Sequence, residues 1–145
     1  MKKGLSTDNI LPVITLHQPW ATWIMRGWKT IETRTHSRFS CLKGQRILIH
    51  SSKTMATLSN PYLTLDQLAS KPEMGLVTGC ILGSAYVKDF RLLNESDSQA
   101  ALCDCTGRLW GLFLEDIERW KYPIPEKGSQ GIWHFDTDNL IKVRY

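Results

Sequence analysis

The chain has 145 residues, of which 42% are hydrophobic and 22% charged, a composition that excludes disordered and fibrous proteins. This length predicts one domain over residues 1–145, with a single substantial core. A formal charge of +4 inclines the protein toward polyanionic partners, although it lacks the dense basic runs of a dedicated nucleic-acid arm.

No hydrophobic stretch is long enough to span a bilayer, and the N-terminal MKKGLSTDN turns polar too early for a signal peptide. We therefore expect a cytoplasmic protein with no membrane partner and with reduced cysteines. Cys103 and Cys105 have C-x-C spacing, which differs from the C-x-x-C of common zinc sites, and no second close pair completes a ligand set. No metal and no other cofactor are expected.

The first half of the chain predicts two strands and a helix. Residues 11–16 (LPVITL) and 45–50 (QRILIH) have the β-branched or apolar pattern of strands. Pro19 suits the first turn of a helix that continues to about residue 25. Gly27 is expected to end this helix in the left-handed conformation.

The second half is predicted to be mostly β. A short helix at residues 65–69, with Thr64 as its N-cap, precedes it. Residues 76–90 form a long strand that bends at Gly79 and Gly83, as barrels require. The remaining elements are a polar loop at 94–99 and strands at 109–117, 132–135 and 140–143. Together the elements predict an α+β fold, a small mixed β-barrel with flanking short helices.

Three charges gather in GWKTIETR, residues 27–34. Strand periodicity puts Glu32 and Arg34 on one face, whereas Lys29 reaches the same side only if the chain turns after Gly27. Considered alone, such charges are most often an exposed ion pair that adds little stability.

This octapeptide resembles the signature of the ASCH family, a branch of the PUA-like barrels. The family loop is G-x-K-x-x-E-x-R, and Gly27, Lys29, Glu32 and Arg34 fill its four places. Upstream, HQPWA at residues 17–21 is similar to the start of the family's first helix.

Two later stretches extend the resemblance to about residues 13–133. IHSSK at 49–53 is similar to the family strand that ends in a histidine, and PIPEKGSQGIW at 123–133 to the closing strands of bacterial and phage members. The resemblance implies a PUA-like barrel in which the signature loop lines a cleft. It also implies RNA or a modified base as the ligand, since PUA-like relatives bind these.

Eight residues are candidates for contact with nucleic acid: Gln18, Trp20, Lys29, Arg34, His50, Ser52, Lys53 and Lys127. Lys29 and Arg34 suit phosphates. Glu32 is unfavourable beside phosphate, so it indicates base-edge recognition, orientation of Lys29, or acid–base chemistry. Trp20 either stacks on a base or is core, whereas Trp23 is expected in the core.

The other candidates each have a structural alternative. Gln18 either contacts a base or caps the helix. His50 and Ser52 share one face of their strand, which Lys53 follows, and could meet the cleft. Considered alone, a histidine at a strand end is usually a hydrogen-bonded structural residue. Lys127 lies in EKGSQG, where backbone N–H groups either approach a phosphate or only connect two strands.

Three functions follow, of which we favour the first. The first is a module that binds RNA, single-stranded nucleic acid or a modified nucleoside. The second is a hydrolase, either a ribonuclease or an amidohydrolase of an N-acylated nucleoside, with Lys29 and Glu32 as the catalytic pair. Amidohydrolase members use a lysine and a threonine of the loop, and Glu32 stands at the threonine position. The third is an interaction domain in which these charges only hold the helix to the barrel. The oligomeric state is left open.

Overall fold

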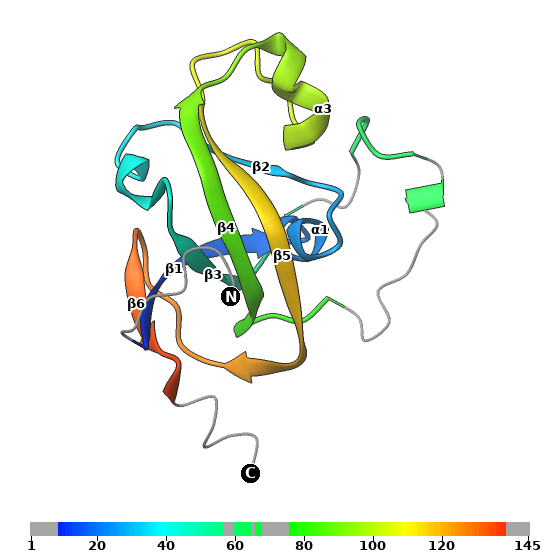
Figure 1. Ribbon diagram of the computed structural model, residues 1–145. Coiled ribbons are helices and arrows are strands. Elements are labelled where there is room, and N and C mark those ends of the chain that lie inside the picture. The colour runs from blue at the N-terminus through cyan, green and yellow to red at the C-terminus, as the bar shows by residue number, and fades with distance from the viewer. Residues whose placement is uncertain (1–8, 57–59, 65, 68–75, 139–145) are drawn as a thin grey trace.

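A six-stranded sheet organises the protein in the computed structural model, which describes residues 9–56, 60–64, 66–67 and 76–138. The strands are β1 Ile10–Gln18, β2 Ile31–Arg34, β3 Arg46–Met55, β4 Cys80–Leu92, β5 Trp110–Pro125 and β6 Trp133–Asp136. Their order is β2-β5-β4-β3-β1-β6, and β1 and β3 are parallel while the other neighbours are antiparallel. Figure 1 shows β4 and β5 as the long central pair.

Short helical segments flank the sheet. They are α1 Trp20–Met25, η1 Ser40–Leu42, η2 Glu95–Asp97 and α3 Ser98–Ala101. The predicted α+β fold, with bent strands and short flanking helices, is confirmed. The sheet curls without closing, because β2 and β6 are its two edges among the described residues.

The largest core cluster lies between α1 and the sheet. Ala21 and Ile24 of α1 pack there against fully buried strand residues such as Ile14, Ile49 and Leu112. Burial of such side chains stabilises the fold by roughly 1.5–3 kcal/mol for each. Because α1 begins directly after β1, this core also fixes the position of the loop that follows the helix.

The bend predicted at Gly83 is present. The pairing of β4 shifts register there, against β3 between Ile49 and His50 and against β5 between Ile81 and Gly83. A Cβ atom on Gly83 would lie 2.0 Å from the Glu118 carbonyl oxygen. Only glycine allows the two backbones to approach this closely.

Several predicted boundaries are wrong. β4 begins at Cys80 rather than at residue 76, because Gly79 has a φ of +68° and this left-handed backbone cannot continue a strand. Gly79 therefore precedes the strand and does not bend it. β5 continues past the predicted end at residue 117 to Pro125, although Asp116 interrupts it with a φ of +50°.

The polar loop predicted at residues 94–99 is also wrong, since η2 and the start of α3 occupy it. Asn94 forms a capping box: its Oδ1 accepts from the Ser96 N–H at 2.9 Å, and Asp97 Oδ2 accepts from the Asn94 N–H at 2.9 Å. This reciprocal pattern satisfies the first free N–H groups of a helix.

Two predictions fall on residues that the structure does not describe. The strand at 140–143 lies outside the described residues, as does most of the helix at 65–69. At the start of that helix, Thr64 Oγ1 accepts from the Gln67 N–H at 3.1 Å, which is the predicted N-cap contact. No helix of the described residues is long and apolar enough to cross a membrane.

Candidate functional site

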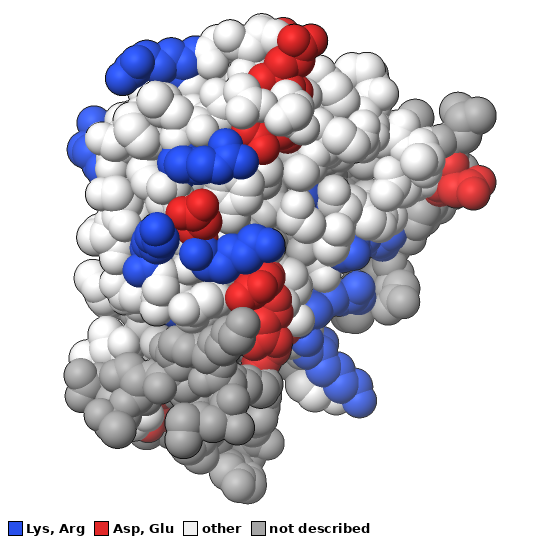
Figure 2. All heavy atoms as spheres, turned by 45° about the horizontal axis from the view of Figure 1, so that its top comes forward, with Lys and Arg blue, Asp and Glu red and all other residues white. Residues whose placement is uncertain are grey.

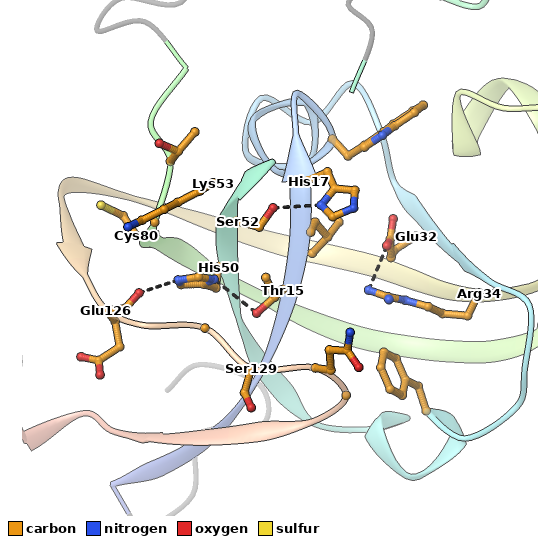
Figure 3. A pocket seen from close by; sticks show the side chains of 18 of the residues that line it. Thr15, His17, Glu32, Arg34, His50, Ser52, Lys53, Cys80, Glu126 and Ser129 are labelled. Atoms are coloured by element: carbon orange, nitrogen blue, oxygen red, sulfur yellow. Dashed lines mark hydrogen bonds and ion pairs between the residues drawn. The ribbon is translucent and has the colours of Figure 1, made fainter. Parts of the chain in front are cut away.

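A cleft of about 1430 Å³ lies over the ends of β1 and β3. On one side are β2 and the residues after it, and on the other is the segment 126–131 between β5 and β6 (Figure 3). Eight of the nine residues singled out from the sequence line this cleft: Trp20, Lys29, Glu32, Arg34, His50, Ser52, Lys53 and Lys127.

Gln18 does not line the cleft, because its side chain is buried beneath the start of α1. Its Nε2 donates to the Val77 carbonyl at 2.7 Å and to Thr22 Oγ1 at 2.8 Å. Its Oε1 accepts from the Thr22 N–H at 3.0 Å. All of these contacts hold α1 in place, so Gln18 supports the cleft from behind.

One end of the cleft, which we name the charged end, consists of Trp20, Lys29, Glu32 and Arg34. Gly27 has a φ of +77° and turns the chain back, so that the N–H groups of Trp28 and Lys29 both donate to the Trp23 carbonyl, at 3.0 and 3.1 Å. This turn points Lys29 inward, where its side chain is only 2% exposed.

The Lys29 ammonium has three neighbours. Nζ donates to the Ala101 carbonyl, lies 3.6 Å from Glu32 Oε1 and lies 5.1 Å from the centroid of the Trp20 ring. Trp20 is half-buried and packs edge-on against the buried Trp23, with centroids 5.1 Å apart. The ammonium thus sits at the base of the cleft rather than on the protein surface.

Glu32 joins the two cations of the charged end. Its Oε2 forms an ion pair with Arg34 Nη2 at 3.1 Å, while Oε1 faces Lys29. The Arg34 guanidinium also lies 4.8 Å from the centroid of the Phe39 ring. Its Nε is buried and has no hydrogen-bond partner among the described residues. A buried donor without an acceptor is costly, and Arg34 is one of the residues that line the cleft.

On the opposite side, Thr15, His50 and Gly128 line the cleft, and Trp133 contacts Thr15 and His50 without lining it. We name these four residues the neutral wall. Trp133 Nε1 donates to Thr15 Oγ1 at 3.0 Å, Thr15 Oγ1 lies 3.2 Å from His50 Nδ1, and His50 Nε2 lies 2.8 Å from the Glu126 carbonyl (Figure 3). Because a carbonyl only accepts, we assign the ring proton to Nε2 and the Thr15 hydroxyl as donor to Nδ1.

Burial lowers the pKa of His50 below its ordinary value of 6.5, which keeps the ring neutral near pH 7 and agrees with this assignment. The segment 126–131 closes over the ring. A Cβ atom on Gly128 would lie 2.5 Å from His50 Cε1, so glycine is needed for this contact. The neutral wall is therefore a satisfied hydrogen-bond network that fixes the position of Lys127 and its neighbours.

Sequence reasoning missed several residues that line the cleft: Thr15, His17, His36, Arg38, Phe39 and Ser129. His17 Nδ1 lies 2.9 Å from Ser52 Oγ, a contact between β1 and β3. The signal that would have revealed it is the parallel register that pairs Thr15 with His50, which no local pattern contains. His36 and Arg38 lie beyond the signature loop and belong to no recognisable motif.

The cysteines are free thiols. Cys103 lines the cleft, and its Sγ is 4.0 Å from that of Cys105. Burial raises the pKa of Cys105 to about 11 and raises that of Cys80, so both stay protonated near pH 7. No group of three or more His, Cys, Asp or Glu side chains in the described part of the chain could hold a metal ion.

Positive and negative side chains alternate on the face of the molecule in Figure 2, so no single-sign field covers it. Exposed ion pairs also occur in the described residues, such as Lys43 with Asp89 at 3.2 Å. The modest net charge is therefore not gathered into one broad patch on this face, and recognition of a polyanion depends on local sites such as the cleft.

The comparisons with known proteins agree on one family. The family model of the ASCH domain matches residues 14–128. The chain is similar in structure to ASCH from Zymomonas mobilis, with a TM-score of 0.59 and 16% identity over 92% of each chain. A tyrosine-to-phenylalanine mutant of that protein gives a TM-score of 0.60 and 17% identity, over 91% of this chain and 96% of that one. No curated protein matches the chain.

Proposed function

The chain belongs to the ASCH domain family, and we propose that it binds single-stranded nucleic acid, RNA in particular, in the cleft. The charged end carries this proposal: the half-buried Trp20 ring lies beside the Lys29 ammonium, and Glu32 joins this ammonium to the Arg34 guanidinium. Neither cation has its full set of hydrogen-bond partners among the described residues. An aromatic face next to polar groups at the base of a cleft suits an unstacked base.

The rim of the cleft suits the sugar-phosphate backbone. Arg38, Lys53 and Lys127 are exposed and line the cleft, so they are able to follow phosphates without losing hydration. Lys29, in contrast, is buried beside a carboxylate. A phosphate there would be repelled by Glu32, and a neutral base would not.

A hydrolase with Lys29 and Glu32 as its acid–base pair is the second candidate, favoured by their 3.6 Å contact. Glu32 is shared with Arg34 as well. Its two oxygens thus face two different cations, an arrangement that suits a hydrogen-bond acceptor held in place for a ligand. We therefore place binding ahead of turnover.

Fluorescence anisotropy with short labelled RNA and DNA strands, over a salt series from about 50 to 300 mM, tests the proposal. Affinity should fall steeply with salt, since bound phosphates release counterions. Mass spectrometry of the same mixtures, and of a panel of modified nucleosides, would detect any product. If the protein binds none of the strands at low salt, nucleic-acid binding is wrong. If product accumulates, the hydrolase is the better description.

A further inference from the structure

The charged end has unused hydrogen-bond donors on both sides of one acceptor. An ammonium has three N–H groups, and Lys29 Nζ makes one hydrogen bond within the described residues, to Ala101. Its distance of 3.6 Å from Glu32 Oε1 is too long for a second. For a cation with 2% of its surface exposed, this is an incomplete set of partners.

Arg34 is incomplete in a similar way. A guanidinium facing a carboxylate normally forms two parallel hydrogen bonds, but here Nη2 alone contacts Glu32, at 3.1 Å. Nε is buried and has no hydrogen-bond partner among the described residues. Both cations therefore hold donors for which the described residues supply no acceptor.

Glu32 lies between these donors, because its two oxygens face different cations, Oε1 toward Lys29 and Oε2 toward Arg34. A carboxylate has about four lone-pair sites, so it retains acceptor capacity. Lys29, Glu32 and Arg34 thus form a row of a donor, an acceptor and a donor. Its complement is a ligand edge with an N–H between two carbonyl oxygens.

We propose that the charged end recognises the imide edge of uracil-type bases, with the base N–H on Glu32 and its two carbonyl oxygens on Lys29 and Arg34. This inference rests on the proposed function and names the base that the cleft takes. Among the standard bases, uracil and thymine alone present acceptor, donor, acceptor on this edge. Cytosine presents two acceptors beside an amine, and guanine an acceptor beside two donors, so each leaves a buried polar group unpaired, at a cost in affinity.

The experiment compares matched hexamers of uridine, cytidine and N3-methyluridine, binding to the full chain by fluorescence anisotropy at low salt. N3-methyluridine keeps the ring and both carbonyl oxygens and removes the N–H. The uridine strand should bind roughly tenfold more tightly than the cytidine strand, the discrimination typical of one good polar pairing. The methylated strand should lose this advantage. A thymidine hexamer separates recognition of the imide, which uracil and thymine share, from recognition of the 2′-hydroxyl, which only the ribose strand carries.

Glu32→Gln supplies the test on the protein side, because glutamine keeps the size of the side chain and adds a donor to the row. The ratio of uridine to cytidine affinity should fall below about threefold. Lys53→Ala is the matched control, and it should weaken all strands equally while keeping the ratio. Melting temperatures establish that both variants fold, and the methylated strand tests the idea without any variant.

The outcomes separate the two proposals. Equal binding of uridine, cytidine and N3-methyluridine strands overturns recognition of the imide edge and leaves nucleic-acid binding in place. Absence of binding to all strands overturns both. A preference for uridine that methylation abolishes, and that Glu32→Gln abolishes as well, supports both.

Discussion

The charged end and the neutral wall face each other across one cleft, and both are built from polar side chains that strands and loops bury. In the neutral wall, Trp133, Thr15 and His50 form a chain in which every polar side-chain atom has a partner. In the charged end, Lys29 and Arg34 retain donors that the described residues do not satisfy.

This difference suggests a structural role for the neutral wall and a role in ligand recognition for the charged end. A satisfied neutral network gains nothing from a ligand and serves to rigidify the backbone around it. An incompletely satisfied charged cluster carries a desolvation cost that a ligand with matching groups would relieve. Both regions include residues from stretches that resemble the family, yet of the two only the charged end has hydrogen-bond donors that the described residues leave unsatisfied. Four predictions test this contrast.

The largest effect is expected at the aromatic pair beneath the charged end. Trp23→Ala should lower the free energy of unfolding by roughly 3–5 kcal/mol, because Trp23 is buried against Leu63 and Leu102. Trp20→Ala should lose less stability but weaken nucleic-acid binding by about 1–3 kcal/mol, the range for a base stack. Chemical denaturation and anisotropy measure the two quantities. If Trp20→Ala binds like the wild type, Trp20 belongs with the core.

At the neutral wall, Gly128→Ala should destabilise the protein by about 1–3 kcal/mol through overpacking, since the new methyl group would lie 2.5 Å from His50 Cε1. Gly107→Ala is the matched control, because nothing lies within 4 Å of its Cβ position, and it should stay within about 0.5 kcal/mol of the wild type. Equal denaturation midpoints for the two variants would show that segment 126–131 is not clamped on His50.

At the charged end, Lys29→Met keeps the apolar stem and removes the ammonium. It should cost roughly 1–3 kcal/mol of stability, because the Ala101 carbonyl loses its partner. It should also weaken RNA binding. Lys53→Ala is exposed, so its stability should change by less than about 0.5 kcal/mol while the salt slope of binding falls by about 1. If Lys29→Met changed the stability as little as Lys53→Ala does, Lys29 would not be a buried residue at the base of the cleft.

The smallest effect is a pH dependence of the neutral wall. Burial holds the pKa of His50 in the folded protein below its ordinary value of 6.5, so the unfolded chain takes up a proton first as pH falls. Stability is therefore complete above pH 6.5 and declines below it, until the folded protein binds the proton as well.

Melting temperatures between pH 7.5 and 5 measure this decline, and His50→Gln should flatten it. His36 also lowers the stability as pH falls, because partial desolvation and the charges of Arg38 and Arg34 lower its pKa. His36→Gln is therefore the parallel control. An unchanged decline in the His50 variant would assign the pH dependence elsewhere.

Local patterns account for much of the fold. β1 contains the predicted strand, β3 and β6 begin one residue later than predicted, and α1 ends before Gly27 as expected, although Pro19 is its N-cap rather than part of its first turn. The error at the end of β5 has a distant cause. β5 continues through Lys121 and Tyr122 because β4 pairs with Pro125 and Ile124. Locally, the proline at position 123 argues against a continuing strand.

What the sequence determined by itself is the chemistry of the site: the lysine, glutamate and arginine of the signature loop, the glycine that turns the chain, and the strand that ends in His50. What only the tertiary structure decided is which of these groups are satisfied. Ala101 is 72 residues from Lys29, and Glu126 is 76 residues from His50. Burial and hydrogen bonding depend on such distant pairings, so the sequence names the groups while the fold determines which of them remain available to a ligand.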